Sequence, residues 1–250
     1  MGKLDGRVAL ITGSGRNIGR ATALMMVSEG ANIVVNARNN RDEAEATAAA
    51  VEELGVKALP VIADVSNKEQ VDAMIDAAIS TFGRIDILVN NAAIRPHKPF
   101  TELTLEDWEH VRGVVLDGSF YTTRGVIQQM VDNNYGRIVF LTGDGAFRGS
   151  PLRAHVSAAK MGLVGMARAL ASEFAPHNIR VNVIAPGSID TTRANPEWYA
   201  GRVPDSSGIP LGRQGKPEEI ASAVTFLCTE DGGFVTGQTL HVNGGQGYFG

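Results

Sequence analysis

The sequence contains one cysteine, no cluster of basic residues and no low-complexity tract. The single cysteine, Cys228, cannot form a disulfide within the chain, and it excludes a metal site built from several cysteines. It lies on an apolar predicted helix, where a small buried side chain is typical. We therefore expect neither a disulfide framework nor a bound metal.

The charge balance and the length of the apolar runs exclude two further classes. The formal net charge of the 250 residues is −4, which gives no indication of binding to nucleic acid or to an anionic membrane surface. The first apolar run, residues 8–11, is too short for a secretion signal or a membrane span. We expect a protein that stays in the cytosol.

A glycine-rich turn, residues 12–19, follows this first apolar run and precedes an amphipathic helix. Gly13 and Gly15 allow the backbone to turn sharply and to approach a ligand, while Gly19 allows the helix to pack closely on the strand. Such a turn presents backbone N–H groups and a helix N-terminus to a phosphate. The spacing G-x-G-x-x-x-G is a weak indication by itself, because glycine turns also occur where nothing binds.

Beyond the turn, short apolar runs alternate with helical patterns. The predicted strands lie at residues 31–37, 56–62, 85–90, 137–141, 179–184 and 238–242. The predicted helices lie at residues 42–54, 68–82, 105–131, 150–174 and 216–228. Thr104 with Asp107 predicts a capping box, and Ser150-Pro151 predicts a helix start. The alternation predicts one α/β domain over residues 1–250, a three-layer fold with a doubly wound parallel sheet of about seven strands.

In such a fold ligands bind beyond the carboxyl ends of the strands, so the segments that follow the strands are expected to surround one site. The longest of them, residues 186–215, has about 30 residues where about 4 to 6 are usual. We interpret it as a lid over the site. Its aromatic pair, Trp198 and Tyr199, is compatible with covering an apolar ligand or with packing on a neighbouring subunit.

The motifs at these strand ends resemble those of the short-chain dehydrogenase/reductase family, in particular its 3-oxoacyl-acyl-carrier-protein reductase group, along essentially the whole chain. The resemblance rests on residues 12–19, 64–65, 90–93, 186–187 with Thr191, and 237–245. It implies a Rossmann-type domain that binds NAD(P), acts on a small-molecule substrate and assembles as a homotetramer or homodimer.

The resemblance also implies which residues bind the cofactor. Adenine would lie by Asp64 and Val65, the ribose by Asn90, and the nicotinamide amide by Ile189 and Thr191. The full set is Gly13, Arg16, Asn17, Ile18, Gly19, Arg38, Asp64, Val65, Asn90, Lys160, Pro186, Gly187, Ile189 and Thr191.

The turn departs from the family pattern at Asn17, which stands where the family has its middle glycine. Asparagine tolerates left-handed backbone better than most residues, so we expect the turn to be kept. The second strand ends in Asn36-Ala37-Arg38, without the acid that bonds the ribose 2′-hydroxyl in NAD sites. Arg38 together with Arg16 favours NADP over NAD. The alternative is that Arg38 only opens a solvated polar loop.

The family's proton machinery is a tyrosine four residues before a lysine, a serine and an asparagine. The lysine is present as Lys160, but the other three positions fall on Val156, Gly143 and Val115. Reduction of a carbonyl leaves an alkoxide that needs a proton, and the tyrosine supplies it in the family. Valine and glycine side chains cannot donate a proton, so the standard mechanism is not possible in this chain.

Asp144 follows the fifth predicted strand at a position that lines the family's substrate pocket. A carboxyl group in a partly apolar cleft can act as acid or base. The equal alternative is a turn residue. His155, Arg153 and His97 are interpreted as structural or surface residues. Lys160 can also serve only to bind the ribose hydroxyls of the nicotinamide.

Three functions fit these observations. The first is an NADP-dependent oxidoreductase that acts on a carbonyl or alcohol through a non-standard proton donor, with Lys160 and Asp144 as the catalytic residues. The second is a non-redox lyase or hydratase in the inherited pocket, and the third is a catalytically inactive NADP-binding subunit that pairs with a competent homologue. We take the first as the prediction.

Overall fold

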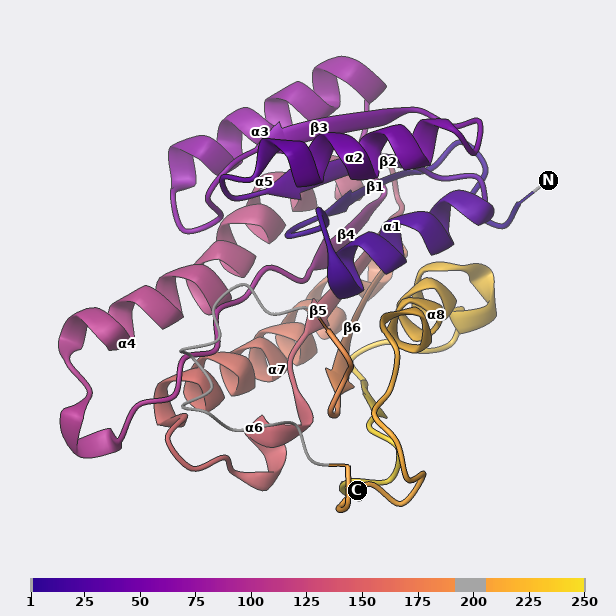
Figure 1. Ribbon diagram of the computed structural model, residues 1–250. Coiled ribbons are helices and arrows are strands. Elements are labelled where there is room, and N and C mark those ends of the chain that lie inside the picture. The colour runs from indigo at the N-terminus through magenta and orange to yellow at the C-terminus, as the bar shows by residue number, and fades with distance from the viewer. Residues whose placement is uncertain (1, 192–205, 250) are drawn as a thin grey trace.

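The computed structural model describes residues 2–191 and 206–249. A seven-stranded sheet runs through its centre, with the strand order β3-β2-β1-β4-β5-β6-β7 (Figure 1). All neighbouring strands are parallel. The strands are β1 Val8–Ile11, β2 Asn32–Ala37, β3 Ala58–Ile62, β4 Ile87–Asn90, β5 Gly136–Leu141, β6 Ile179–Pro186 and β7 Thr239–Val242. The predicted doubly wound parallel sheet is confirmed, and its order reverses between β1 and β4, which is where such sheets bind ligands.

Helices cover both faces of the sheet (Figure 1). Helices α1, α2 and α8 pack on one face, and α3, α4, α5 and α7 on the other. Their bounds are α1 Asn17–Ser28, α2 Arg41–Glu52, α3 Lys68–Phe82, α4 Leu105–Arg112, α5 Gly118–Asp132, α6 Asp144–Arg148, α7 Ala154–Phe174 and α8 Pro217–Cys228. Single 3-10 turns lie at Phe100–Glu102, Ala175–His177 and Glu230–Gly232.

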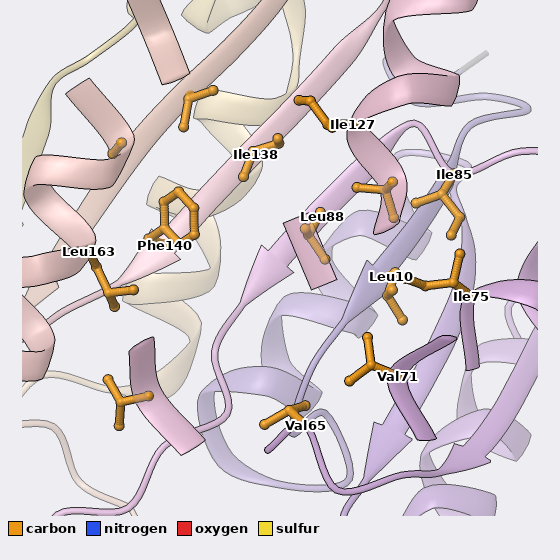
Figure 2. Close-up of a cluster of buried hydrophobic side chains, with 14 of the residues drawn as sticks. Leu10, Val65, Val71, Ile75, Ile85, Leu88, Ile127, Ile138, Phe140 and Leu163 are labelled. Carbon is orange, nitrogen blue, oxygen red and sulfur yellow. The ribbon is translucent and has the colours of Figure 1, made fainter. Parts of the chain in front are cut away.

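The strands are apolar on both faces because helices cover both. Along β5, Ile138 and Phe140 belong to the cluster under α3, α5 and α7, while Val139 and Leu141 belong to the cluster under α1 and α8. Figure 2 shows Ile138 and Phe140 among the side chains of the first cluster. This alternation holds the sheet rigidly between its two helical layers, so the strand ends are fixed relative to one another.

The predicted helix at residues 105–131 is confirmed, with one irregularity. A π-helical turn, Gly113–Asp117, joins α4 to α5. The capping box of Thr104 and Asp107 is present at the start of α4. Mid-helix π turns add one residue per turn and redirect the side chains beyond them.

The predicted helix start at Ser150-Pro151 is wrong, because α7 begins at Ala154. The Ser150 hydroxyl donates instead to the carbonyl oxygen of Gly145, at 3.1 Å. Leu152 then has a left-handed backbone, with φ +66°, which a right-handed helix cannot continue. Ser150-Pro151 therefore belongs to the loop between α6 and α7 and does not begin a helix.

The two described flanks of the predicted lid lie together. Ile189 forms a parallel bridge with Gly215, and the Asp190 N–H donates to the Gly215 carbonyl oxygen at 2.8 Å. Residues 192–205, with Trp198 and Tyr199, lie outside the described residues. Within residues 2–191 and 206–249, no helix is long and apolar enough to span a membrane.

Candidate active site

The glycine turn between β1 and α1 has the conformation that its residues predict. Gly13 has φ +63°, and Asn17 has φ +52°, so the expected left-handed asparagine is confirmed. Helix α1 begins at Asn17, and its N-cap Arg16 makes no side-chain cap. Helices α2 and α3, in contrast, are capped by Asn40 and Asn67. The N-cap side chain therefore does not cover the N-terminus of α1, and helix N-termini are where anions bind.

Two asparagines from neighbouring strand ends hold the turn in place. Asn91, after β4, donates from Nδ2 to the carbonyl oxygens of Thr12 and Gly13, at 2.8 and 3.0 Å. Asn36, in β2, accepts from the Gly13 N–H at 3.1 Å. The sequence motifs alone indicate no such role for these two side chains. One feature of the sequence could have indicated this role. Each asparagine lies at or just beyond the end of a buried apolar strand, where a polar side chain needs hydrogen-bond partners.

A cleft of about 400 Å³ opens beside the turn. It brings together many of the residues predicted to bind a cofactor, namely Gly13, Arg16, Asn17, Ile18, Gly19, Arg38, Asp64, Val65 and Thr191. The Asp64 carboxylate accepts from the Ser66 N–H and hydroxyl, at 2.9 and 2.6 Å. These residues come from four separate segments of the chain, which the parallel sheet places at one edge.

The two arginines of the cleft have different surroundings. A guanidinium nitrogen of Arg16 lies 3.6 Å from a carboxylate oxygen of Glu43, which also lines the cleft. Arg38 is exposed and makes no ion pair with another described residue. The two predicted cations therefore differ: Arg16 lies beside a carboxylate, whereas Arg38 makes no ion pair with a described carboxylate.

A second cavity, of about 450 Å³, adjoins the cleft. Both spaces are lined by Ile18, Asn91, Ala93 and Thr191, so they form one continuous depression. The remaining predicted site residues that line this second cavity are Asp144, Lys160, Pro186, Gly187 and Ile189.

Asn90 is the one predicted site residue that lines neither space. Its side chain is buried against α5, where Oδ1 accepts from the Thr122 hydroxyl at 2.6 Å. Its Nδ2 donates to the Thr123 hydroxyl at 3.2 Å. The side chain therefore fixes α5 to β4. A ligand in the cleft would contact the residues that follow Asn90 and not its side chain.

Lys160 lies on α7, one turn after Val156, and both side chains line the cavity. Its Nζ donates to the Leu141 carbonyl oxygen at 2.5 Å, and its own carbonyl oxygen accepts from the Thr142 hydroxyl at 3.2 Å. Burial, with a smaller contribution from the Arg95 guanidinium, lowers the pKa of Lys160 to about 7. This amine can therefore exchange a proton near neutral pH.

Asp144 is the first residue of α6 and is buried. Its Oδ2 accepts from Arg148 Nε at 2.5 Å, and its Oδ1 accepts from Asn243 Nδ2 at 3.0 Å. His241 Nδ1 lies 3.7 Å from Oδ1. Asp144 is thus more than a turn residue, because it ties α6 to the segment that follows β7.

Basic side chains also line the cavity, and two of them, His97 and Arg153, are the ones interpreted from the sequence as structural or surface residues. Arg95, His97, Arg148 and Arg153 all line it. His155 does not: it is buried, and neither ring nitrogen has a hydrogen-bond partner among the described residues. Burial lowers the pKa of His155. Among the described residues, no group of three or more His, Cys, Asp or Glu side chains could hold a metal ion.

Comparison with known proteins identifies the family of the chain. The sequence profile of the family described as enoyl-(acyl carrier protein) reductase matches residues 13–246. A 3-oxoacyl-[acyl-carrier-protein] reductase from Aquifex aeolicus is 38% identical over 245 residues, which cover 98% of each chain. The chain belongs to the short-chain dehydrogenase/reductase family.

Further members of the short-chain dehydrogenase/reductase family are equally similar. A subunit of (2S)-[(R)-hydroxy(phenyl)methyl]succinyl-CoA dehydrogenase from Thauera aromatica is 41% identical over 253 residues, 98% of each chain. A crystal structure of a protein assigned as a short-chain alcohol dehydrogenase, from Sinorhizobium meliloti 1021, superposes with a TM-score of 0.90 at 34% identity, covering 97% of each chain. The resemblance found in the sequence is thereby confirmed at the level of the family.

The close packing at Gly19 gives a first testable prediction. A Cβ atom at Gly19 would lie 2.3 Å from the Gly13 carbonyl oxygen and 2.7 Å from Asn91 Nδ2, so Gly19→Ala must displace the turn. We expect it to lower the free energy of unfolding by about 1 to 3 kcal/mol in chemical denaturation. The matched control is Gly165→Ala on α7, where a Cβ meets nothing within 4 Å. It should be neutral or stabilising. Equal stability of the two variants would contradict the tight turn.

Proposed function

We propose that the chain binds NADP(H), in preference to NAD, in the cleft and acts as an oxidoreductase on a carbonyl or alcohol in the adjoining cavity. The observation that carries this proposal is the continuity of the two spaces, which lets one ligand in the cleft meet a second ligand beside Lys160. Relatives named 3-oxoacyl-[acyl-carrier-protein] reductases support a carbonyl substrate. Assembly as a homotetramer or homodimer stays a prediction.

The described residues fit a dinucleotide. Cβ atoms at Gly13 and Gly19 would meet backbone atoms at 3.2 and 2.3 Å, so these two positions of the turn have no room for a side chain. The uncapped N-terminus of α1 suits a pyrophosphate. When bound, the nicotinamide supplies or accepts a hydride.

Arg38 supports NADP in this proposal. No carboxylate follows β2 where an NAD site would use one on the ribose 2′-hydroxyl, and the exposed Arg38 guanidinium can instead pair with a 2′-phosphate. Arg16 contributes less, because Glu43 lies beside it.

Arg38→Asp tests the cofactor preference. The change removes a charge-assisted hydrogen bond and adds a repelling carboxylate, so we expect the Kd for NADPH to rise about tenfold or more, while the Kd for NADH does not rise. Fluorescence titration of both cofactors measures this. Arg41→Gln is the control, since Arg41 is exposed on α2, pairs with Glu45 and lies outside the cleft. An unchanged NADPH affinity in Arg38→Asp would leave the preference unsupported.

Lys160 is the group that we propose to transfer the proton. Its amine lines the cavity one turn from Val156, the position where the family has its tyrosine. With a pKa of about 7, its ammonium form can give a proton to the oxygen of a carbonyl that is being reduced. In the opposite direction its neutral amine can accept the proton of an alcohol. The hydrogen bond to the Leu141 carbonyl oxygen orients the amine in both forms.

Asp144 is the second candidate for proton transfer, because it lines the same cavity. Its two oxygens already accept from Arg148 and Asn243. Both oxygens are thus engaged in binding other parts of the chain, so we place Asp144 after Lys160.

The pH dependence of turnover separates the two candidates. The protonated fraction of Lys160 falls as pH rises through about 7, so carbonyl reduction should slow above pH 7 and alcohol oxidation should speed up. Lys160→Met should lower the rate by about 10²- to 10⁴-fold, whereas Lys57→Met, at an exposed site remote from the cavity, should not. If Asp144→Asn abolishes this pH dependence and Lys160→Met keeps it, Asp144 is the donor.

A second candidate function is an NADP-binding subunit without turnover of its own. Val156 and Gly143 line the cavity at the family's tyrosine and serine positions and offer no hydroxyl. The relative from Thauera aromatica is, by its name, a subunit of a dehydrogenase. Such a chain would bind NADPH and oxidise or reduce nothing when purified alone.

Restoring the missing groups tests whether the cavity has otherwise kept its chemistry. A Cβ at Gly143 would meet nothing within 4 Å, so Gly143→Ser fits without strain, and Val156→Tyr places a phenol one turn from Lys160. We expect the double variant to reduce ketones at least tenfold faster than the unchanged chain, measured as NADPH consumption over a ketone panel. No gain in a folded variant that binds NADPH would mean that the cavity no longer accepts such ketones.

A further inference from the structure

The cavity beside Lys160 has a charge opposite to that of the whole chain. The formal net charge of the chain is −4, yet the described lining carries Arg95, Arg148, Arg153, Lys160 and His97. The described part of this lining contains one carboxylate, that of Asp144. A concave space with a surplus of one charge concentrates the field of that charge and attracts ligands of the opposite sign.

The one described carboxylate of the lining, that of Asp144, forms an ion pair with Arg148. Asp144 is 1% exposed and accepts from Arg148 Nε at 2.5 Å. Its other oxygen accepts from Asn243. Lys160, in contrast, feels the like charge of Arg95. Arg95 and Lys160 are therefore close enough in the cavity for their like charges to act on each other.

Arg95 and Arg153 come from two loops that are joined to each other. The Lys98 N–H, in the loop after β4, donates to the Leu152 carbonyl oxygen at 2.8 Å, directly before Arg153. This bond holds the two loops side by side at the cavity. Guanidinium groups bind carboxylates through two parallel N–H bonds, so two arginines on fixed loops form a suitable recognition site for one.

We propose that the cavity selects carbonyl or alcohol substrates that carry a carboxylate, which Arg95 and Arg153 bind while the reacting carbon lies toward Lys160. The bound carboxylate would also relieve the repulsion between Arg95 and Lys160. This inference deepens the proposed oxidoreductase function and rests on it. The cavity, at about 450 Å³, has the size of a small-metabolite site.

The first experiment compares ligands that differ only in charge. Oxo acids from 4-oxopentanoate to 8-oxononanoate, and the primary amides of the same acids, are titrated into the NADPH-saturated protein by calorimetry. We expect at least one acid to bind about tenfold or more tightly than its amide, and its affinity to fall with added NaCl while that of the amide does not. Equal affinities in every pair, or no binding by any acid, would overturn the proposal.

The second experiment assigns the preference to residues. Arg95→Gln and Arg153→Gln should each lower the acid-to-amide preference about tenfold, whereas Arg168→Gln should keep it, since Arg168 is exposed on α7 outside the cavity. The unfolding midpoint and the Kd for NADPH show that each variant is folded. A preference that survives in both cavity variants would exclude these arginines as the carboxylate site.

The failure of this inference is distinguishable from the failure of the proposed function. The Kd for NADPH is measured first, without any oxo acid. If NADPH does not bind, the proposed function fails, and the comparison of acids with amides without cofactor still decides the charge preference of the cavity. If NADPH binds and acids show no advantage, the oxidoreductase proposal stands and the carboxylate inference fails.

Discussion

Parallel hydrogen bonding between all seven strands is the constraint on which the rest of the structure depends, because it places every carboxyl end at one edge. Gly13, Asp64, Asn91, Gly143 and Gly187 are far apart in the sequence and meet only for this reason. The helices on both faces keep the sheet from bending, so these segments hold their relative positions. The site is thus a product of strand alignment more than of any single motif.

Much of the fold and of the nucleotide cleft could be predicted from the sequence, because the patterns that indicate them lie within short stretches of the chain. Buried strands and amphipathic helices have short-range periodicity, and the turn at Gly13 to Gly19 has a steric requirement that few residues meet. Even its irregular member, Asn17, was predictable, because asparagine accepts a positive φ.

What could not be predicted depends on contacts between distant residues. Asp144 meets Asn243 across 99 positions, and nothing near Asp144 in the sequence indicates that partner. Arg95 and Arg153 lie in loops, whose paths follow from what they pack against and have no periodicity. Ser150-Pro151 failed as a helix start for a local reason, since the Ser150 hydroxyl donates to the Gly145 carbonyl oxygen, five residues earlier in the preceding helix.

The segment after β7 is the last described part of the site to be synthesised. Asn243 binds Asp144, and Gln246 lines the cavity while its Oε1 accepts from the Ser188 N–H at 2.9 Å. The described lining of the nucleotide cleft, in contrast, ends at Thr191. A ribosome makes the chain from its N-terminus, so the strands around the cleft emerge well before the last wall of the cavity. The last residues to be synthesised therefore complete the substrate cavity, after every described residue that lines the nucleotide cleft has been made.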